Sequence, residues 1–600
     1  MGVLVASLFV VLVIRLVRLQ VVHSDIYLRQ SETNRVRVLE KPPLRGLMLD
    51  RNGRLMVDNY PSYTLFAVPQ MLDKNKETRD TLLALTGLDE EEFNRRLHRI
   101  PGNRYTPVRI VRDLTFPTLA ALEERRARMP GILFRVETKR AYPTPVAPHT
   151  LGHIGELKEE SAADYPNQQT GDIVGLSGLE EQWNDVLMGH KGFEYLEVDA
   201  LGRVVGPLPG VKPIPAEQGS DLVLTIDLDL QLRAEELLGE QAGAVVAMEP
   251  QTGEVLAIAS KPDYPPETFA GLLTPEDWRR LQDDEKTPLM HRAIQGLYPP
   301  GSVFKMAVLA AGLQSETINT SWKVTCNGVY QLGRRPFRCW NHAGHGEVDH
   351  ELSIESSCDI FYYLLGNKLG IDKFHNEISR FGFGQVTGID LPHESAGLLP
   401  GRAFMDRRYG ENRWTSGHLF NISIGQGDVL VTPLQAALYA SALANGGYWM
   451  TPHLVREIHQ ADGTVLTPDD MERHETGFDP EVMQIIRDDM LQVTKGAHGT
   501  AHWLYDPRMD VAGKTGTSQN PQGTDHALFI AFAPFENPEI AVAVVVEHGE
   551  HGSTAAAPIA MKLIRQRLGL DDETWLRYRW KVIADQRRAQ AQIQPEGPTE

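Results

Sequence analysis

The sequence predicts a multidomain protein of the α+β class. At 600 residues and 67.0 kDa the chain is too long for one hydrophobic core, so two or three domains are expected. A turn of prolines and glycine at 299–301 precedes good helix formers at 302–311, which predicts a helix there. The apolar run 528–534 and the alternating run 540–547 predict two adjacent strands of a sheet.

The N-terminus is apolar from residue 3 to residue 14, and after Arg15 and Arg18 the apolar run continues to residue 22. Because a helix of roughly 20 residues spans a bilayer, residues 1–22 are expected to form a transmembrane anchor. A signal peptide is the alternative, but neither a basic leader nor a small-residue cleavage site is visible. Since basic residues belong on the cytoplasmic side and here follow the apolar run, we expect the true start to lie upstream.

Residues 23–215 are expected to form a first domain without a catalytic constellation. This stretch is rich in Arg and Pro, and its Glu/Arg-rich segment 119–128 predicts a helix. Four prolines between positions 207 and 215 mark a linker. An apolar strand at 222–226 then opens a second domain, residues 216–570.

The charge of the chain argues against nucleic acid as a partner. The formal net charge is -19, and no basic stripe of the kind that binds phosphate backbones is visible. After residue 570 the chain turns polar and rich in Gln and Arg, so residues 571–600 are expected to be a disordered tail.

Ser302 and Lys305 form the first of three short motifs. Ser302 stands at the start of the predicted helix, and the spacing places Lys305 one turn along on the same face, within reach of the serine hydroxyl. A base beside a hydroxyl makes a nucleophile. Lys305 accepts a proton only when burial or a second cation lowers its pKa, and Lys514 is a candidate for that cation.

The second motif consists of Ser357, Cys358 and Asp359 at the head of a predicted helix at 360–369. Ser357 and Asp359 can therefore both point from the helix start into a cleft, and Ser357 suits the relay of a proton to a leaving amine. Taken alone, the two residues also fit an ordinary pair of helix caps.

The third motif runs from Lys514 through Thr515 and Gly516 to Thr517 at a predicted strand edge. Gly516 leaves room for a substrate backbone, and the N–H groups of Thr517 and Ser302 are expected to form an oxyanion hole. Singly, Ser302 also fits a plain cap and Lys514 a solvated strand end. The order of all three motifs favours a penicillin-reactive serine acyltransferase.

With these motifs the chain resembles the class B penicillin-binding proteins, and most closely their elongation-type branch, over nearly its whole length. Most penicillin-reactive enzymes carry Asn where this chain has Asp359, and Asp at this position matches the elongation-type branch. Further matching segments occur in the same order: Arg45 and Gly46, Asp50 to Gly53, Gly175 to Glu180, Glu197 to Arg203, Gly425 to Gly427, and Gly499 to Ala501.

The resemblance implies a penicillin-binding domain like the serine β-lactamases, with helices on an antiparallel sheet, behind a non-catalytic pedestal of the dimerisation type. It implies that Ser302 attacks the D-Ala-D-Ala carbonyl of a peptidoglycan stem peptide while Lys305 takes its proton. Ser357 and Lys514 resemble the relay and the electrostatic clamp. Thr515 and Thr517 resemble the hydroxyls that hold the terminal carboxylate of the substrate.

By the same resemblance, an amine of a neighbouring stem peptide displaces the acyl ester and forms a cross-link during elongation. β-Lactam antibiotics would acylate the same serine. The implied partners are a glycan polymerase of the SEDS family and other elongation proteins, and the implied location is the inner membrane with the catalytic domain in the periplasm.

Three other functions share the motifs. A β-lactamase needs a water-activating carboxylate and would not carry an anchor and a pedestal. A D,D-carboxypeptidase hydrolyses the same acyl-enzyme, and the residues near Ser302 do not exclude it. A β-lactam sensor or a catalytically weak scaffold would use the fold for binding, but a sensor needs a cytoplasmic output domain.

The three cysteines, Cys326, Cys339 and Cys358, lie close to His345 in the sequence. Together the four residues suit a closed tetrahedral site for structural zinc. A Cys326–Cys339 disulfide with one thiol left over is the alternative in an oxidising compartment, and three free thiols are a further one. No cofactor is expected for catalysis. The pair His548 and His551 near Glu547 is expected to lie in a solvated loop after a strand.

Overall fold

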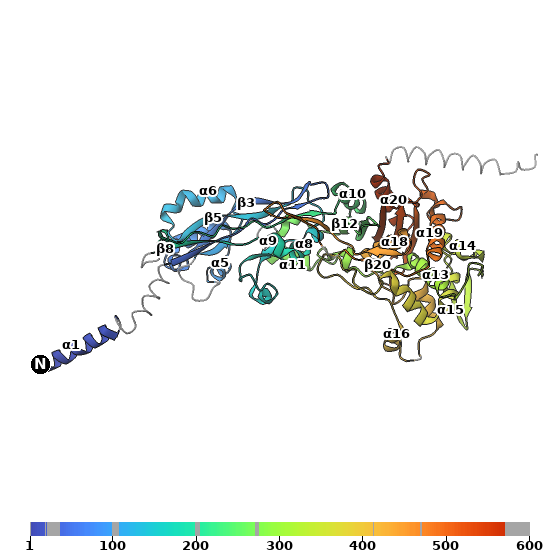
Figure 1. Ribbon diagram of the computed structural model, residues 1–600, viewed down its shortest axis with the longest axis horizontal. Helices are drawn as coiled ribbons and strands as arrows, with labels where there is room; N and C mark the ends of the chain where they lie inside the picture. Colours follow the sequence, from blue (N-terminus) through green and yellow to red (C-terminus); the bar gives the residue numbers. More distant parts are fainter. Residues whose placement is uncertain are drawn as a thin grey trace, which may run out of the picture.

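The computed structural model describes residues 2–18, 20, 36–98, 107–198, 204–269, 275–411, 413–468, 471–521 and 523–570. The molecule is elongated, with an N-terminal part at one end and a C-terminal part, beginning with strand β10, at the other (Figure 1). Both parts combine helices with mostly antiparallel sheets, which confirms the α+β prediction. The predicted tail at 571–600 lies outside the described residues.

Helix α1 spans Gly2–Val17. Within the described ranges, no helix has both the length and the apolarity needed to cross a membrane. The predicted anchor at residues 1–22 includes positions outside these ranges, and it stays a prediction.

The centre of the C-terminal part is a five-stranded antiparallel sheet with the strand order β12-β11-β23-β22-β21. The two strands predicted near the C-terminus pair with each other as β22 and β23, so that prediction is confirmed. Almost every residue of the sheet is buried on both faces, which explains runs of Val and Ala without alternation in β11 and β23. The strands are β11 Gly243–Met248, β12 Val255–Lys261, β21 Ala512–Ser518, β22 His526–Ala533 and β23 Ile540–Val546.

Helices cover this sheet and form a second, mainly helical region beside it. Helices α10 and α20 pack on each other and on the sheet, while α18 packs on β11, β22 and β23. Helix α13 is buried along most of its length and contacts α15, which also packs against α17. Gly366 of α15 permits that approach, because a Cβ there would lie 1.6 Å from the Ser423 hydroxyl oxygen. The helices are α10 Leu228–Leu238, α11 Pro275–Gln282, α12 Arg292–Gln295, α13 Lys305–Gln314, α14 His350–Glu355, α15 Asp359–Ile378, α16 Arg402–Tyr409, α17 Ser416–Ser423, α18 Pro433–Ala444, α19 Pro480–Lys495 and α20 Ala556–Arg567.

The N-terminal part is built on the long antiparallel pair β3 and β5, with β4 beside β3. Helices α4, α5 and α6 bury a separate apolar core against these strands, and α6 confirms the helix predicted near residue 119. A second sheet has the order β1-β8-β9. The strands are β1 Val36–Lys41, β2 Met48–Leu49, β3 Leu55–Ala67, β4 Val108–Val111, β5 Ile132–Ala141, β6 Ile154–Glu156, β7 Ile173–Gly175, β8 Gly192–Val198 and β9 Val204–Pro207. The remaining helices are α3 Pro69–Leu72, α4 Lys76–Thr86, α5 Glu90–Leu97, α6 Phe116–Arg125, α7 Pro148–Leu151, α8 Gly178–Gln182 and α9 Asn184–Met188.

One sheet runs through both parts. Strand β10, Asp221–Leu224, confirms the strand predicted at 222–226 and pairs in parallel with β2 and in antiparallel fashion with β18. The two parts therefore share backbone hydrogen bonds as well as side-chain contacts. The other short strands of the C-terminal part are β13 Val324–Cys326, β14 Val329–Leu332, β15 Arg335–Arg338, β16 Gly346–Val348, β17 Tyr448–Met450, β18 Val455–His459, β19 Val465–Leu466 and β20 Arg473–Glu475.

Two buried histidines lie at the junction of the parts. His149 of α7 contacts the carbonyl oxygen of Pro288 at 2.6 Å, and His291 contacts the hydroxyl of Thr150 at 3.2 Å. Burial lowers the pKa of His149 to about 4 and lowers that of His291 well below its usual value. Both rings are therefore neutral at pH 7, and protonation opposes this contact.

The junction is expected to weaken in acid. Because the pKa of His149 is lower in the folded chain than its unfolded value of about 6.5, its contribution to stability is complete above that pH and is lost as the pH falls toward 4. The loss from His149 amounts to about 3 kcal/mol. Between pH 7 and pH 5, we expect the thermal midpoint of the His149→Gln variant to fall less than the thermal midpoint of the unchanged chain. The exposed His190→Gln serves as control, and equal pH dependence of all three proteins would contradict the prediction.

Candidate active site

Ser302 lies in a tight turn at the start of a buried helix. Residues Gly301–Phe304 form a 3-10 turn that leads directly into α13, so the predicted helix start is confirmed with a tighter first turn. Ser302 is half-buried, whereas Lys305 is completely buried. The turn thus leaves the serine hydroxyl nearer to solvent than the amine.

Strand β21 packs directly against this turn. Gly301 has a φ of +55°, and a Cβ there would lie 2.5 Å from the carbonyl oxygen of Thr517. The Gly301 N–H donates to the carbonyl oxygen of Gly425 at 2.8 Å, and the Gln426 amide donates to the Thr517 carbonyl oxygen at 2.9 Å. These contacts bring Ser302 next to the third motif.

The ammonium of Lys305 joins the first and second motifs. Its Nζ donates to the carbonyl oxygen of Ser357 at 2.8 Å, to the Ser357 hydroxyl at 3.2 Å and to Asp359 Oδ1 at 2.7 Å. No hydrogen bond joins Lys305 to the Ser302 hydroxyl in the part of the chain that the structure describes. Proton transfer between those two groups therefore stays a prediction.

Ser357 adopts a backbone conformation that is unusual for a residue with a side chain. Its φ is +57°, in the left-handed region, where a Cβ crowds the backbone. This conformation presents both the carbonyl oxygen and the hydroxyl of Ser357 to Lys305. Helix α15 then begins at Asp359, and its first straight segment ends at Gly370, whose φ is +69°. The predicted helix at 360–369 is confirmed.

Lys514 lies on β21 at the edge of the sheet and is completely buried. Burial lowers its pKa well below the usual value, the positive charge of Lys305 lowers it further, and Asp359 raises it. The structure therefore brings the two lysines close enough to interact electrostatically, and the role predicted for Lys514 as the cation that makes Lys305 a base stays a prediction. Lys514 Nζ donates to the Thr515 carbonyl oxygen at 3.1 Å.

The rest of the third motif is held by neighbouring loops. The hydroxyls of Thr515 and Thr500 lie 2.7 Å apart, and the segment before Thr500 is tied to α14 because the His498 N–H donates to Glu355 Oε1 at 2.8 Å. Gly516 is tightly packed within the chain, since a Cβ there would lie 3.0 Å from a methyl group of Val303. The proposed approach of a substrate at Gly516 stays a prediction.

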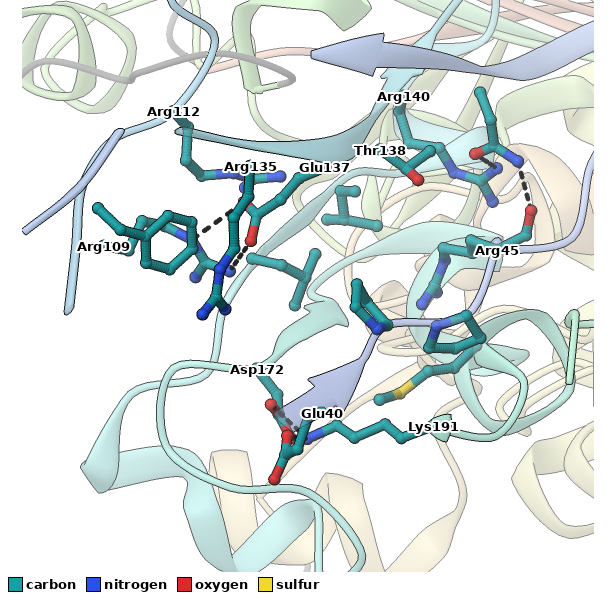
Figure 2. A pocket seen from close by; sticks show the side chains of 17 residues that line it. Glu40, Arg45, Arg109, Arg112, Arg135, Glu137, Thr138, Arg140, Asp172 and Lys191 are labelled. Carbon is teal, nitrogen blue, oxygen red and sulfur yellow. Dashed lines mark hydrogen bonds and ion pairs between the residues drawn. The ribbon is translucent and has the colours of Figure 1, made fainter. Parts of the chain in front are cut away.

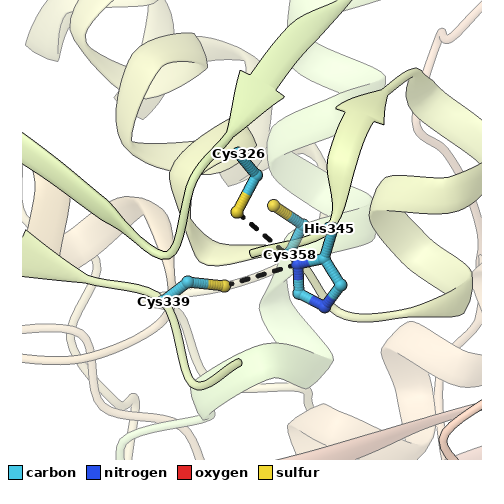
Figure 3. Close-up of side chains that lie close together, drawn as sticks. All are labelled: Cys326, Cys339, His345 and Cys358. Carbon is cyan, nitrogen blue, oxygen red and sulfur yellow. Dashed lines mark hydrogen bonds between the residues drawn. The ribbon is translucent and has the colours of Figure 1, made fainter. Parts of the chain in front are cut away.

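Directly behind the second motif, the three cysteines and His345 converge (Figure 3). Their ligating atoms all lie within 4.8 Å of one another. His345 Nδ1 is 3.6 Å from the sulfur of Cys326 and 3.6 Å from that of Cys339. All three cysteines are free and buried, so the alternative Cys326–Cys339 disulfide is absent from the structure.

This cluster is connected to Asp359. The Asp359 N–H donates to the Cys339 sulfur at 3.4 Å. A hydrogen bond from Cys358 lowers the pKa of Cys339 against the effect of burial, and His345 contributes to the lowering. Three cysteine sulfurs and one imidazole nitrogen are the set of donors found in closed tetrahedral zinc sites.

Comparisons with known proteins agree with this geometry. A family model described as the penicillin binding protein transpeptidase domain matches residues 243–565, and one described as the penicillin-binding protein dimerisation domain matches residues 40–224. The peptidoglycan D,D-transpeptidase MrdA of Acinetobacter baumannii is 34% identical over 575 residues, which cover 92% of this chain and 84% of that protein. The chain belongs to the class B penicillin-binding proteins, in the MrdA branch.

Solved structures show the same architecture. Penicillin-binding protein 2 of Helicobacter pylori, in a complex with MreC, matches with a TM-score of 0.78 at 28% identity and covers 89% of this chain and 99% of that chain. A chain of a peptidoglycan synthase complex, described as coordinating polymerization and crosslinking, matches with a TM-score of 0.69 at 28% identity over 95% of this chain and 98% of that one.

Two contacts in this penicillin-binding protein are not apparent from its sequence. The Trp340 N–H donates to Asp359 Oδ2 at 2.9 Å. The one feature of the sequence that could have pointed to this contact is that Trp340 directly follows Cys339. Glu547 accepts hydrogen bonds from Arg292 and from the Tyr298 hydroxyl, at 2.8 and 2.7 Å, and so fixes the segment before Ser302.

The loop predicted around His548 and His551 follows β23, as expected. His548 Nδ1 contacts the carbonyl oxygen of Thr524 at 3.1 Å. Within the described residues, the one group of ligands close enough to share a metal ion is the set formed by the cysteines and His345.

Gly301→Ala is expected to slow acylation by a β-lactam by more than about tenfold, because the added methyl group would displace the Ser302 turn from Thr517. Gly333→Ala is the matched control: Gly333 has a φ of +59°, but a Cβ there meets nothing within 4 Å. Both variants carry similar backbone strain. Rates of labelling by a fluorescent penicillin and thermal midpoints would be compared, and equal labelling rates for the two variants would contradict the prediction.

Proposed function

We propose that this chain is a peptidoglycan D,D-transpeptidase that cross-links stem peptides through a serine acyl-enzyme during cell elongation. The observation that carries the proposal is the position of the buried Lys305 amine, which contacts Ser357 and Asp359 beside Lys514 and lies one helical turn from Ser302. The match to the transpeptidase family and the identity with MrdA support it.

In the proposed reaction, Ser302 Oγ attacks the carbonyl carbon of the penultimate D-Ala, and Lys305, in its neutral amine form, accepts the hydroxyl proton. The N–H groups of Ser302 and Thr517 bind the resulting oxyanion. Ser357 relays the proton to the departing amine, so the terminal D-Ala leaves as the tetrahedral intermediate collapses to an ester. Asp359 holds Lys305 in position throughout.

The second half of the reaction reverses these steps with another nucleophile. An amine of a neighbouring stem peptide attacks the ester, loses a proton through the same relay and releases Ser302. Lys514, Thr515 and Thr517 bind the terminal carboxylate of the donor peptide, and Gly516 allows its backbone to come close. A β-lactam enters the same site and leaves a slowly hydrolysed ester on Ser302.

Ser302→Ala is expected to abolish covalent labelling by a fluorescent penicillin, since no other hydroxyl would occupy the attacking position. The full chain is expected to carry one adduct on the peptide that contains Ser302, as measured by intact and peptide mass. Ser321→Ala, at an exposed serine, is the control and should label normally.

The alternatives give different results in the same assay. Rapid loss of the adduct would indicate a β-lactamase, and release of D-Ala from a pentapeptide without cross-linking would indicate a D,D-carboxypeptidase. A folded chain without any adduct would overturn the proposal and leave a scaffold.

The proposed organisation is an inner-membrane anchor at residues 1–22, a pedestal at 23–215 and a catalytic domain at 216–570 in the periplasm, followed by a polar tail at 571–600. The matched dimerisation and transpeptidase models support the division in two. Proposed partners are a SEDS-family glycan polymerase and further elongation proteins. The similarity to a chain of a peptidoglycan synthase complex and to a protein solved with MreC supports such an assembly.

A structural zinc ion is proposed at Cys326, Cys339, His345 and Cys358. Three sulfurs and one imidazole nitrogen complete a tetrahedral shell without an open position, so the ion would supply no step of the reaction. Its role would be support: Cys358 separates Ser357 from Asp359 in the chain, and Cys339 accepts from the Asp359 N–H.

The purified chain is expected to contain about one zinc per molecule, measured by elemental analysis. His345→Ala should lose the metal, lower the thermal midpoint and slow acylation, because Asp359 and Ser357 lose their support. His342→Ala, at an exposed histidine three residues away, should keep all three properties. A metal-free chain whose mass lacks two hydrogens would instead establish the disulfide.

A further inference from the structure

The N-terminal part contains a cavity that has no role in the proposed cross-linking reaction (Figure 2). It has a volume of about 210 Å³ and lies where the segment after β1 meets β3, β4 and β5 and the β6–β7 hairpin. Its basic side chains are Arg45, Arg109, Arg112, Arg135, Arg140 and Lys191.

The lining carries an excess of positive charge. Six basic side chains line the cavity together with the acidic Glu40, Glu137 and Asp172. Glu156 and Glu180 pair with three of these basic groups, so the formal excess around the cavity is one positive charge. The whole chain has a formal charge of -19. A basic cavity in so acidic a protein concentrates anions locally.

Part of this charge is neutralised within the chain. Lys191 Nζ lies 2.7 Å from Asp172 and 3.0 Å from Glu40. Arg109 pairs with Glu137 at 2.8 Å and with Glu156 at 2.9 Å. Of the cavity's basic groups, these two are therefore fully engaged by carboxylates.

Arg45 and Arg140 share one buried carboxylate. Arg45 Nε lies 2.6 Å from Glu180 Oε2, and Arg140 Nε lies 2.7 Å from Glu180 Oε1. Arg140 is only 1% exposed, and its Nη2 has no hydrogen-bond partner among the described residues. A buried guanidinium donor without an acceptor is costly, so an acceptor supplied from the cavity would be stabilised.

Arg112 is half-buried at the same cavity and has no hydrogen-bond or ion-pair partner in the described ranges. Burial lowers its pKa, and the positive charge of Arg109 lowers it further. An anion in the cavity would stabilise the charged form of Arg112 against both burial and the repulsion from Arg109.

The cavity also has an apolar lining. Pro42, Pro43, Phe66, Ile154 and Met188 contribute to it, and Figure 2 shows carbon-rich side chains beside the charged groups. A ligand that fills this space therefore combines a charged group with an apolar one.

We propose that the cavity binds the phosphate or diphosphate group of an amphiphilic anion. Planar guanidinium forks match phosphate oxygens, and the free donors of Arg112 and of Arg140 Nη2 favour a group with several acceptor oxygens over a single carboxylate. Such a ligand would connect the segment after β1 with β4 and β5 and so stiffen the N-terminal part. This site is independent of the proposed cross-linking function.

The test is isothermal titration calorimetry of the full chain with inorganic pyrophosphate, hexyl phosphate and hexanoate. Hexyl phosphate is expected to bind about tenfold or more tightly than hexanoate, whose apolar chain is only one methylene shorter but which carries a single charge. Failure of both phosphates to bind, or equal affinity for hexanoate, would overturn the proposal.

Three variants locate the binding. Arg112→Glu should weaken binding of hexyl phosphate by at least about tenfold, and Arg112→Lys, which keeps the charge but loses the fork, should weaken it less. Arg128→Glu makes the same change of charge at an exposed arginine outside the cavity and should have no effect. Equal loss in Arg112→Glu and Arg128→Glu would place the anion elsewhere and contradict the assignment.

The source of the phosphate is distinguished with vesicles. If the natural ligand is a lipid headgroup, vesicles that contain phosphatidic acid should bind the unchanged chain more tightly than Arg112→Glu, while vesicles of phosphatidylcholine bind both equally. If the two proteins bind both kinds of vesicle alike but differ for hexyl phosphate, the ligand is a soluble phosphate.

Discussion

The site depends on the burial of one ammonium group, that of Lys305. A charged amine removed from water is very unfavourable unless acceptors surround it. Here Ser357 supplies two oxygens and Asp359 supplies a carboxylate, so the second motif must lie against the first for Lys305 of α13 to be buried. Lys514 adds a second buried amine nearby, whose lowered pKa reflects both burial and the charge of Lys305.

The surrounding structure keeps those acceptors in place. Ser357 is held in a left-handed backbone conformation. Both carboxylate oxygens of Asp359 accept hydrogen bonds, one from Lys305 and the other from the Trp340 N–H. The loop that carries Trp340 is anchored in turn by the cluster of cysteines. On the opposite side, glycine at 301 lets β21 approach the serine turn more closely than any side chain would permit. Contacts with residues outside the three motifs therefore help to position the catalytic side chains.

The N-terminal part is joined to the C-terminal part by backbone pairing and by a buried histidine contact. Strand β10 joins β2 of one part to β18 of the other, and α7 inserts a neutral histidine at the junction. Further from the site, Arg45 and Arg140 both bind the buried carboxylate of Glu180. At both ends of the molecule, buried basic side chains are thus held by acidic side chains that are distant in the sequence.

Local patterns in the sequence were sufficient for the helix after Ser302, the paired strands near the C-terminus and the order of the three motifs, because periodicity and spacing act over a few residues. They also indicated that the cysteines and His345 belong together. Only the tertiary structure decided that Asp359 binds Lys305, that Trp340 holds Asp359, that Gly516 accommodates Val303, and that basic side chains spread from Arg45 to Lys191 line one cavity. These contacts join residues far apart in the chain or depend on the exact approach of packed elements, which no local pattern specifies.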